Sequence, residues 1–456
     1  MQLRKRVGPV YRGIACLAAC LTVTGVAACS STGTASSSAP SPSSAPSSEN
    51  HYHQINLAAN SEAYKAKFTM PDMVNAWGVA IRPKGAGGHF WVAAGNASYE
   101  FVGDVTASQE EKLRMLYQDP LKAVTIPGTD NSTEETSIGK TTGVVFNGAD
   151  INSDKFAVTT QQAQVDGRTV TLGGSARFIF ATDSGHIAAW GERGPDGKVV
   201  RVDGPSQDVF NGNSQGMQFF GLALKQGSFD TLWAADFGND PQIRQFDKNW
   251  KLVPTVGFAN PFATGDPVDP ANTAKGKKAK PGDPVPWNIT TIGDRVLVSY
   301  VISKPPDKPE PGGPAFDAGE EDSLNKEQEK TTAGHPDKGK LAEFTNTGAL
   351  VRVFEDDGRL NAPWGVALAP ADFGPMSGRL LVGNFGGAGR IAAFDDATGK
   401  FVDYMRDEEE APIGIDGLWN ILFGNGESLG DANALYFAAG PAEEKEALFG
   451  SIRTAR

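Results

Sequence analysis

The feature that most constrains the fold is a short apolar phrase that recurs six times along the chain. Each copy is a run of five residues entered through Gly or Asn, often directly after Trp. The copies occupy 76–80, 142–146, 220–224, 286–290, 363–367 and 418–422, with the Gly or Asn spaced by 65, 78, 67, 77 and 55 residues. A phrase that returns at such intervals indicates an array of similar structural units.

Each copy is followed, after a turn rich in Gly, Pro and Asp, by a second apolar run. These second runs lie at 90–94, 177–182, 232–235, 296–300, 380–383 and 435–439. The first runs are small and apolar on both faces, whereas later runs alternate with charged residues, as expected if the first strand of each unit is pressed between neighbouring units. A ring of units also hides its strand edges. We therefore predict an all-β fold, a six-bladed β-propeller of four-stranded antiparallel blades.

Closing such a ring requires a strand from the other end of the chain. Residues 52–57 are the expected N-terminal closing strand, beside 448–452 in the last blade. A blade needs about 40 to 50 residues, so the surplus must lie in loops. The clearest insertions are near 262–285 and 303–339, which lack apolar periodicity and are expected to be mobile. We expect one propeller domain over 51–456.

Residues 1–28 have the pattern of a lipoprotein signal peptide. A basic segment over 4–12 precedes an apolar stretch over 13–28 that is too short to be a stable transmembrane span. The stretch ends in Val-Ala-Ala followed by Cys29, which resembles the bacterial lipobox, in which the cysteine is acylated and becomes the first mature residue. Cys20 fits the same pattern, but cleavage there would leave an apolar run of only about seven residues. The alternative is an ordinary secreted protein.

Residues 29–50 are rich in Ser, Pro and Ala and predict a flexible tether between the lipid on Cys29 and the folded domain. The expected location is therefore outside the cell, lipid-anchored on the outer side of the cytoplasmic membrane. Removal of the signal peptide also removes Cys16 and Cys20, so after lipidation no free thiol remains for disulfides, metal binding or nucleophilic catalysis.

The charge balance restricts the partners. The chain has 42 basic and 54 acidic residues and a formal net charge of −12. Such a field repels phosphate backbones, so no nucleic-acid partner is expected. The remaining partners are the membrane, through the lipid, and an unknown protein or small-molecule ligand, bound by a monomer.

Several phrases resemble an uncharacterised family of exported bacterial β-propellers. They are 361–367, 378–386, 415–419, 423–426, 435–441 and 448–452. The resemblance extends over about 70–456 and implies six blades, distantly similar to those of NHL-repeat and gluconolactonase (senescence-marker-protein) propellers. It implies no activity, because the family has none assigned. The chain departs from the family pattern in the insertion at 303–339, and in Asn288 and Asn420, where other copies carry Gly or a small residue.

One candidate site follows from the repeat. In an antiparallel blade the start of the first strand and the end of the second lie on the same face of the ring. The polar residues expected on that face are Asn96, Asp183, Asp236, Asn288, Asn384, Asp416 and Asn420. Oxygen ligands from several blades suit a hard cation, so Asp183, Asp236, Asn288 and Asn384 are candidate Ca²⁺ ligands. The alternative is that Asn and Asp at strand ends cap the backbone of the next turn.

Three function classes remain open. The first is a lipid-anchored propeller that binds a ligand or partner at the cell surface, which needs only the scaffold and the tether. The second is a metal-dependent lactonase or esterase, which the resemblance to gluconolactonase-like propellers suggests and which requires the polar residues to form a real metal site. The third is a structural envelope protein. No catalytic residue can be named from the sequence.

Overall fold

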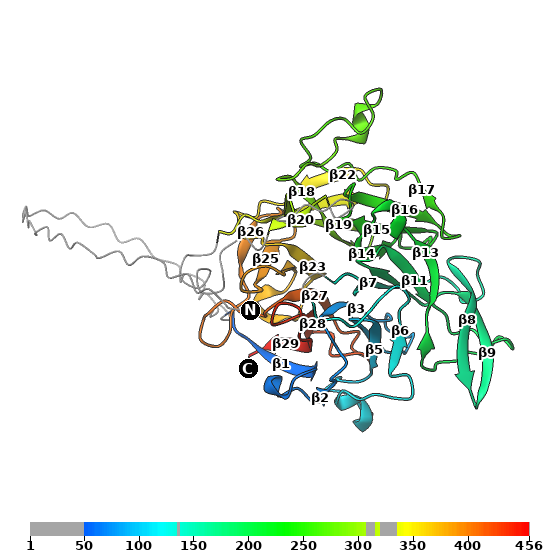
Figure 1. Ribbon diagram of the computed structural model, residues 1–456. Helices are drawn as coiled ribbons and strands as arrows, with labels where there is room; N and C mark the ends of the chain where they lie inside the picture. The colour runs from blue at the N-terminus through cyan, green and yellow to red at the C-terminus, as the bar shows by residue number, and fades with distance from the viewer. Residues whose placement is uncertain (1–49, 135–136, 307–314, 320–334, 456) are drawn as a thin grey trace, which may run out of the picture. The chain divides into compact units, whose positions relative to one another are not determined.

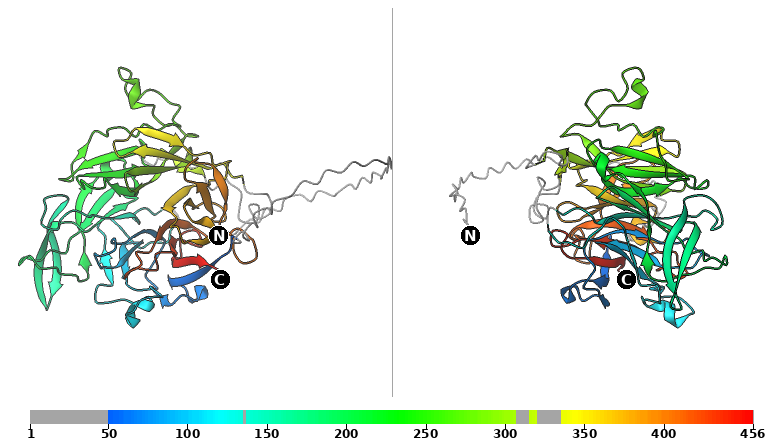
Figure 2. Two further views of the ribbon diagram at one scale, coloured as in Figure 1. Left: turned by 180° about the vertical axis from the view of Figure 1, so that it is seen from behind. Right: turned by 45° about the vertical axis from the view of Figure 1, so that its right-hand side comes forward.

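The computed structural model describes residues 50–134, 137–306, 315–319 and 335–455. Six small sheets stand around a common axis as the blades of a β-propeller (Figures 1 and 2). The main strands within each blade are antiparallel, and the first strand is innermost. The predicted six-bladed, all-β architecture is confirmed.

The first three blades follow one another along the chain. Blade 1 comprises β3 (Ala76–Ala80), β4 (Phe90–Ala94), β5 (Ala97–Phe101) and β6 (Ala123–Thr125), with β12 (Gly204–Pro205) parallel to β6. Blade 2 comprises β7 (Thr141–Phe146), β10 (Phe178–Thr182), β11 (His186–Trp190) and β13 (Gln207–Asn211). Blade 3 comprises β14 (Phe219–Leu224), β15 (Thr231–Asp236), β16 (Gln242–Asp247) and β17 (Leu252–Val253).

The last three blades complete the ring. Blade 4 comprises β18 (Pro284–Ile292), β19 (Arg295–Lys304), β21 (Gly339–Thr345) and β22 (Leu350–Val353), with β20 (Asp317–Ala318) paired to β19. Blade 5 comprises β23 (Pro363–Leu368), β24 (Arg379–Asn384), β25 (Ile391–Asp395) and β26 (Phe401–Tyr404). Blade 6 comprises β27 (Leu418–Phe423), β28 (Leu435–Ala439), β29 (Leu448–Thr454) and β1 (Tyr52–Ala59), with β2 (Phe68–Thr69) parallel to β1.

The N-terminal strand β1 closes the ring, as predicted. It pairs antiparallel with β29, from Tyr52 opposite Thr454 to Ala59 opposite Leu448. The buried Tyr52 hydroxyl also donates to the carbonyl oxygen of Phe373 at 2.8 Å and accepts from the backbone N–H of Met376 at 3.0 Å. Since both partners follow the inner strand of blade 5, the closing strand is fixed to two blades.

Three segments lie outside the four-strand pattern. A hairpin of β8 (Ala157–Val165) and β9 (Arg168–Ser175) is inserted after the inner strand of blade 2 and stands apart from the ring in Figures 1 and 2. This hairpin was not expected from the sequence. The 262–285 insertion makes internal contacts, including bonds from the backbone N–H and hydroxyl of Thr264 to the Asp283 carboxylate. Much of 303–339 lies outside the described residues.

The described helices are single turns of 3-10 helix. They are η1 (Glu62–Tyr64), η2 (Glu111–Arg114), η3 (Asn213–Gln215), η4 (Thr273–Lys275) and η6 (Gly374–Met376). Within the described ranges, no helix has the length and apolar character needed to cross a membrane.

Apolar packing between blades forms most of the core. All five residues of β3 are buried, because the strand has a neighbouring blade on each side. Between blades 1 and 2, the buried rings of Trp91 and Phe178 stack with their centroids 4.1 Å apart. Aromatic pairs of this kind add about 0.5–1.5 kcal/mol to the stabilisation from buried area.

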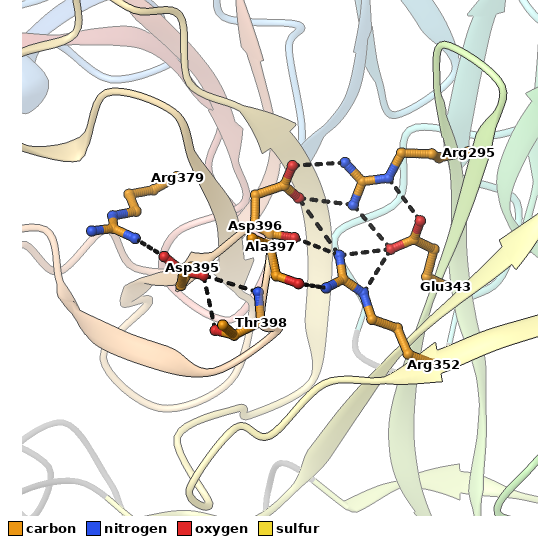
Figure 3. Close-up of polar contacts among 8 residues, drawn as sticks. All are labelled: Arg295, Glu343, Arg352, Arg379, Asp395, Asp396, Ala397 and Thr398. Carbon is orange, nitrogen blue, oxygen red and sulfur yellow. Dashed lines mark hydrogen bonds and ion pairs between the residues drawn. The ribbon is translucent and has the colours of Figure 1, made fainter.

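Ion pairs join blades 4 and 5 farther from the axis (Figure 3). The Arg295 guanidinium contacts the Glu343 carboxylate of its own blade at 2.8 and 3.0 Å and the Asp396 carboxylate of blade 5 at 2.8 and 3.0 Å. Arg352 donates to Glu343 and to the carbonyl oxygens of Asp396 and Ala397. Burial raises the pKa of Glu343, but the two guanidinium groups bring it below its ordinary value. The network is therefore a charge-balanced structural contact.

Candidate functional site

A cavity of about 820 Å³ lies between the six inner strands. Its walls come from the second half of each inner strand and the turn that follows it. The main lining segments are 79–83, 143–146, 222–223, 288–292, 366–368 and 420–423. Each inner strand is an edge strand of its sheet, so its unpaired backbone edge is available to a ligand. A cavity of this size can hold a drug-sized molecule.

The recurring Gly lies where the inner strands of neighbouring blades approach each other closely. A methyl group at Gly78 would lie 2.5 Å from the carbonyl oxygen of Thr142 in the next blade, and one at Gly365 would lie 2.7 Å from that of Trp419. These distances are too short for carbon and oxygen, so only Gly fits where the neighbouring backbones approach this closely. The glycine therefore recurs along the chain because of packing between blades.

Asn288 and Asn420 occupy this same position in blades 4 and 6. The Asn288 Nδ2 donates to the carbonyl oxygen of Trp364 in blade 5 at 2.8 Å, and the Asn420 Nδ2 donates to that of Val79 in blade 1 at 2.8 Å. The hydroxyl of Thr142 makes a comparable bond of 2.6 Å from blade 2 to blade 3. The two asparagines, which depart from the pattern of the other copies, therefore join alternate pairs of blades.

An aromatic cluster lies beside these close contacts between inner strands. It is built largely from the residue that precedes each Gly or Asn, and contains Trp77, Phe220, Trp287, Trp364 and Trp419, with Phe237 and Phe385. Trp419 stacks between Trp77 and Phe385, with ring centroids 3.7 and 3.8 Å away. The cluster fills the centre of the ring before the cavity, so one end of the cavity is bounded by apolar rings.

Three of the residues predicted for the polar face lie at the ends of second strands, outside the cavity lining: Asp183, Asp236 and Asn384. Asp183 accepts from the backbone N–H groups of Gly139 and Lys140 at 2.5 and 2.7 Å. Asn384 accepts from the backbone N–H of Asn361 at 3.0 Å. In each case the donor lies just before the inner strand of the same blade. The two side chains therefore have the same capping role.

Asp236 has the same capping role in blade 3 and also forms an ion pair with the Arg244 side chain. Its carboxylate accepts from the backbone N–H groups of Gln218 and Gly238 at 3.0 and 2.9 Å, and from the Arg244 guanidinium at 2.7 Å. Burial raises the pKa of Asp236 above its ordinary value. Burial also raises the pKa of Asp183 to about 6.

The other predicted residues are placed differently from these caps. Asn96 lies in the turn between β4 and β5, and Asp416 accepts from the backbone N–H of Ala442 at 3.2 Å. Asn288 and Asn420 lie inside their strands rather than at the strand starts. Among the described residues, no group of three or more His, Cys, Asp and Glu side chains is arranged to hold a metal ion. The calcium site stays a prediction, and Cys29 lies outside the described residues.

Buried arginines that were not expected from the sequence line the cavity on blades 1 and 2. Arg82, two residues after β3, makes a two-point ion pair with Glu192, with distances of 3.0 and 2.7 Å. Arg201 binds the same carboxylate at 2.7 Å. Burial raises the pKa of Glu192, but the hydrogen bonds from both guanidinium groups bring it below the usual value. Glu192 is therefore a shared anion between Arg82 and Arg201.

Arg177, directly before β10, is the second arginine of the cavity wall. One of its terminal nitrogens donates to the carbonyl oxygen of Ala149, and its guanidinium lies 6.0 Å from the centre of the Phe146 ring. Burial lowers the pKa of Arg177 below its ordinary value. In the sequence, Arg177 is marked only by its position at the start of a predicted apolar strand.

Comparisons with known proteins supply no activity for this chain. No family model matches the chain. Three uncharacterised proteins of Acanthamoeba polyphaga mimivirus are similar to it: one is 29% identical over 88% of this chain and 80% of its own length, and one is 30% identical over 49% of each. The third is 27% identical over 54% of this chain and 38% of its own.

Solved structures are also similar to the chain. One is a protein of unknown function from Bacteroides thetaiotaomicron, at 10% identity and a TM-score of 0.37, covering 84% of this chain and 70% of the other. The second is the Neurospora crassa Pan2 WD40 domain, at 11% identity and a TM-score of 0.37, covering 90% and 98%. The sheet topology of the chain itself identifies it as a six-bladed β-propeller.

Proposed function

We propose that this protein is exported, is anchored through a lipid on Cys29 to the outer side of the cytoplasmic membrane, and binds a small-molecule ligand in its central cavity. The signal-like segment over 1–28 and the Ser-rich tether support export and anchoring. The observation that carries the binding function is the cavity of about 820 Å³ between the inner strands.

The walls of the cavity suit a ligand of mixed character. Aliphatic side chains such as those of Val144, Val366 and Ile421 supply apolar surface, whereas the hydroxyls of Thr290 and Thr291 and the amide of Gln226 supply polar groups. The Gln226 amide donates to the Thr291 hydroxyl at 3.2 Å, which fixes both side chains at the junction of blades 3 and 4. An apolar lining with a few placed polar groups is typical of small-molecule sites.

The binding function is tested with the neutral fluorescent probe N-phenyl-1-naphthylamine and the full chain carrying Cys29→Ser, which lacks the acyl acceptor. We expect saturable binding of one probe per chain. Thr290→Phe puts a ring into the cavity wall and should weaken binding by about tenfold or more, because it removes the space that the probe occupies.

Thr171→Phe is the matched control, since Thr171 is exposed on the β8–β9 hairpin. It makes the same chemical change outside the cavity and should leave the affinity unchanged. Binding that does not saturate, or that Thr290→Phe and Thr171→Phe affect equally, would show that the probe is not held in the central cavity.

A further inference from the structure

We propose that the ligand of the central cavity carries a carboxylate group, and that Arg177 binds that group. This inference rests on the proposed function, because it assigns a chemical class to the ligand of the same cavity.

Two guanidinium groups converge on this part of the wall. Those of Arg82 and Arg177 lie 5.6 and 6.0 Å from the centre of the Phe146 ring, so they share one side of the cavity. Arg82 is neutralised by the Glu192 carboxylate, which also binds Arg201. The single carboxylate of Glu192 is thus shared by two guanidinium groups. Arg177 adds a third, so this cluster of side chains has an excess of positive charge.

Arg177 lacks such a neutralising partner. The residue is only 7% exposed, and its Nε–H is buried without an acceptor. Within the described part of the chain, no ion pair joins Arg177 to a carboxylate; Glu192 and the exposed Asp150 act on it only from a distance. A buried charge that lacks a paired anion is unfavourable, so an anion beside Arg177 would stabilise the folded state.

The position of Arg177 indicates that such an anion would belong to a ligand in the cavity. The side chain lines the cavity, so an acceptor can reach it from the cavity side. The planar guanidinium group matches a carboxylate through parallel N–H···O bonds. The protein has a formal net charge of −12, so a cationic cavity wall is a local exception to its surface field. Because the rest of the wall is largely aliphatic, we expect the ligand to be an organic acid with an apolar body.

The test compares octanoate with octan-1-ol and octylamine as competitors of N-phenyl-1-naphthylamine on the Cys29→Ser chain. The three competitors share one alkyl chain and differ in the head group. We expect octanoate to bind about tenfold more tightly than octan-1-ol, because a charge-assisted pair replaces a neutral contact. Octylamine should bind more weakly than either, since its cation would face Arg82 and Arg177.

Arg177→Gln should bring the affinity for octanoate down to that for octan-1-ol and leave the latter unchanged. Arg168→Gln, on the exposed hairpin, makes the same charge change outside the cavity and should have no effect. If Arg177→Gln does not fold, Arg177→Lys retains the cation and should still bind octanoate more tightly than octan-1-ol. The comparison of the two competitors on the wild type tests the assignment without any variant.

Two results would overturn the carboxylate assignment while leaving the binding function intact. One is equal affinity of the wild type for octanoate and octan-1-ol, or no displacement by either competitor of a probe that does bind. The other is an Arg177→Gln variant that weakens both competitors equally, which would mean that Arg177 shapes the cavity without contacting the acid. If the neutral probe itself fails to bind, the proposed function fails first.

Discussion

The side-chain amide of Asn420, on the innermost strand of the last blade, donates a hydrogen bond of 2.8 Å to the carbonyl oxygen of Val79 on the innermost strand of the first blade. The bond lies at the point where the ring closes near its axis. The outer strand β1 closes the same blade at its periphery. Ring closure therefore has an inner and an outer component.

The inner component can be removed by Asn420→Ala. We expect a loss of about 1 kcal/mol in the free energy of unfolding, because the Val79 carbonyl loses its donor in a buried position. Denaturant unfolding measures this loss, and the exposed Asn433→Ala serves as the control. A cost no larger than that of the control would mean that the bond contributes nothing to closure.

A second prediction concerns the close approach of Gly221 and Asn288. A methyl group at Gly221 would lie 1.9 Å from the Asn288 Oδ1, so Gly221→Ala should be strongly destabilising. Asn288→Gly removes the clashing side chain, and the double variant should be less destabilised than the sum of the two single changes. Additive losses in this double-mutant cycle would contradict the packing role assigned to the recurring glycine.

The buried carboxyl of Asp183 predicts a pH dependence. Burial raises its folded-state pKa from 3.8 to about 6, so the folded protein binds more protons than the unfolded chain between these values. The contribution of Asp183 to stability is therefore greatest below about pH 4 and is lost as the pH rises to 6. The loss is about 3 kcal/mol, at 1.36 kcal/mol for each unit of pKa.

Asp183→Asn should remove this pH-dependent loss, since Asn384 fills the equivalent position in blade 5 with an amide. Urea unfolding at several pH values between 4 and 7.5 measures the difference between variant and wild type. We expect that difference to grow in favour of the variant as the pH rises. A difference that stays constant with pH would show that Asp183 has no raised pKa.

Asp236→Ala distinguishes a structural cap from a calcium ligand. Its carboxylate is held by two backbone N–H groups and Arg244, so the variant should lower the thermal midpoint both with and without a chelator. A bound Ca²⁺ would instead stabilise the wild type by about 2.7 kcal/mol at one hundred times its dissociation constant. Melting curves with and without EDTA decide between these outcomes: a chelator response in the wild type that Asp236→Ala abolishes would support the calcium site.

Lipid anchoring is tested on the exported protein. We expect the wild type to partition with the membrane fraction into detergent, and Cys29→Ser to block lipoprotein processing because the acyl acceptor is gone. Cys20→Ser is the matched control and should be processed normally. Mass spectrometry that finds an unmodified Cys29, or a mature chain that begins well downstream of it, would contradict the anchor.

The propeller could be predicted from the sequence because its inner strands share a recurring apolar phrase with Gly or Asn, which close packing between blades requires. The glycines at 78 and 365 recur since neighbouring backbones meet there. The closing strand over 52–57 could be expected because ring closure needs a strand from the other end of the chain, and this segment precedes the first inner strand. The β8–β9 hairpin was missed although its turn, Asp166-Gly167, is a common hairpin signal. Its exposed, polar strands lack the apolar character that identified the blades.

The site was harder to predict because the repeat copies structural roles as faithfully as functional ones. Asp183, Asp236 and Asn384 recur as caps of the backbone before each inner strand, and a pattern of oxygen-bearing residues cannot separate caps from ligands. Arg82 and Arg177 occur in only two blades, so no periodicity marks them. Their significance depends on burial and on the sharing of Glu192, which only the folded chain shows.

The central claim is that the cavity between the inner strands holds a ligand. A crystal structure of the protein with 8-bromooctanoate tests it most directly, because anomalous scattering locates the bromine independently of the rest of the molecule. The account predicts one bromine peak between the inner strands, with the carboxylate at Arg177. An empty cavity at a saturating concentration of the acid, or bromine peaks only on the outer surface, would contradict it.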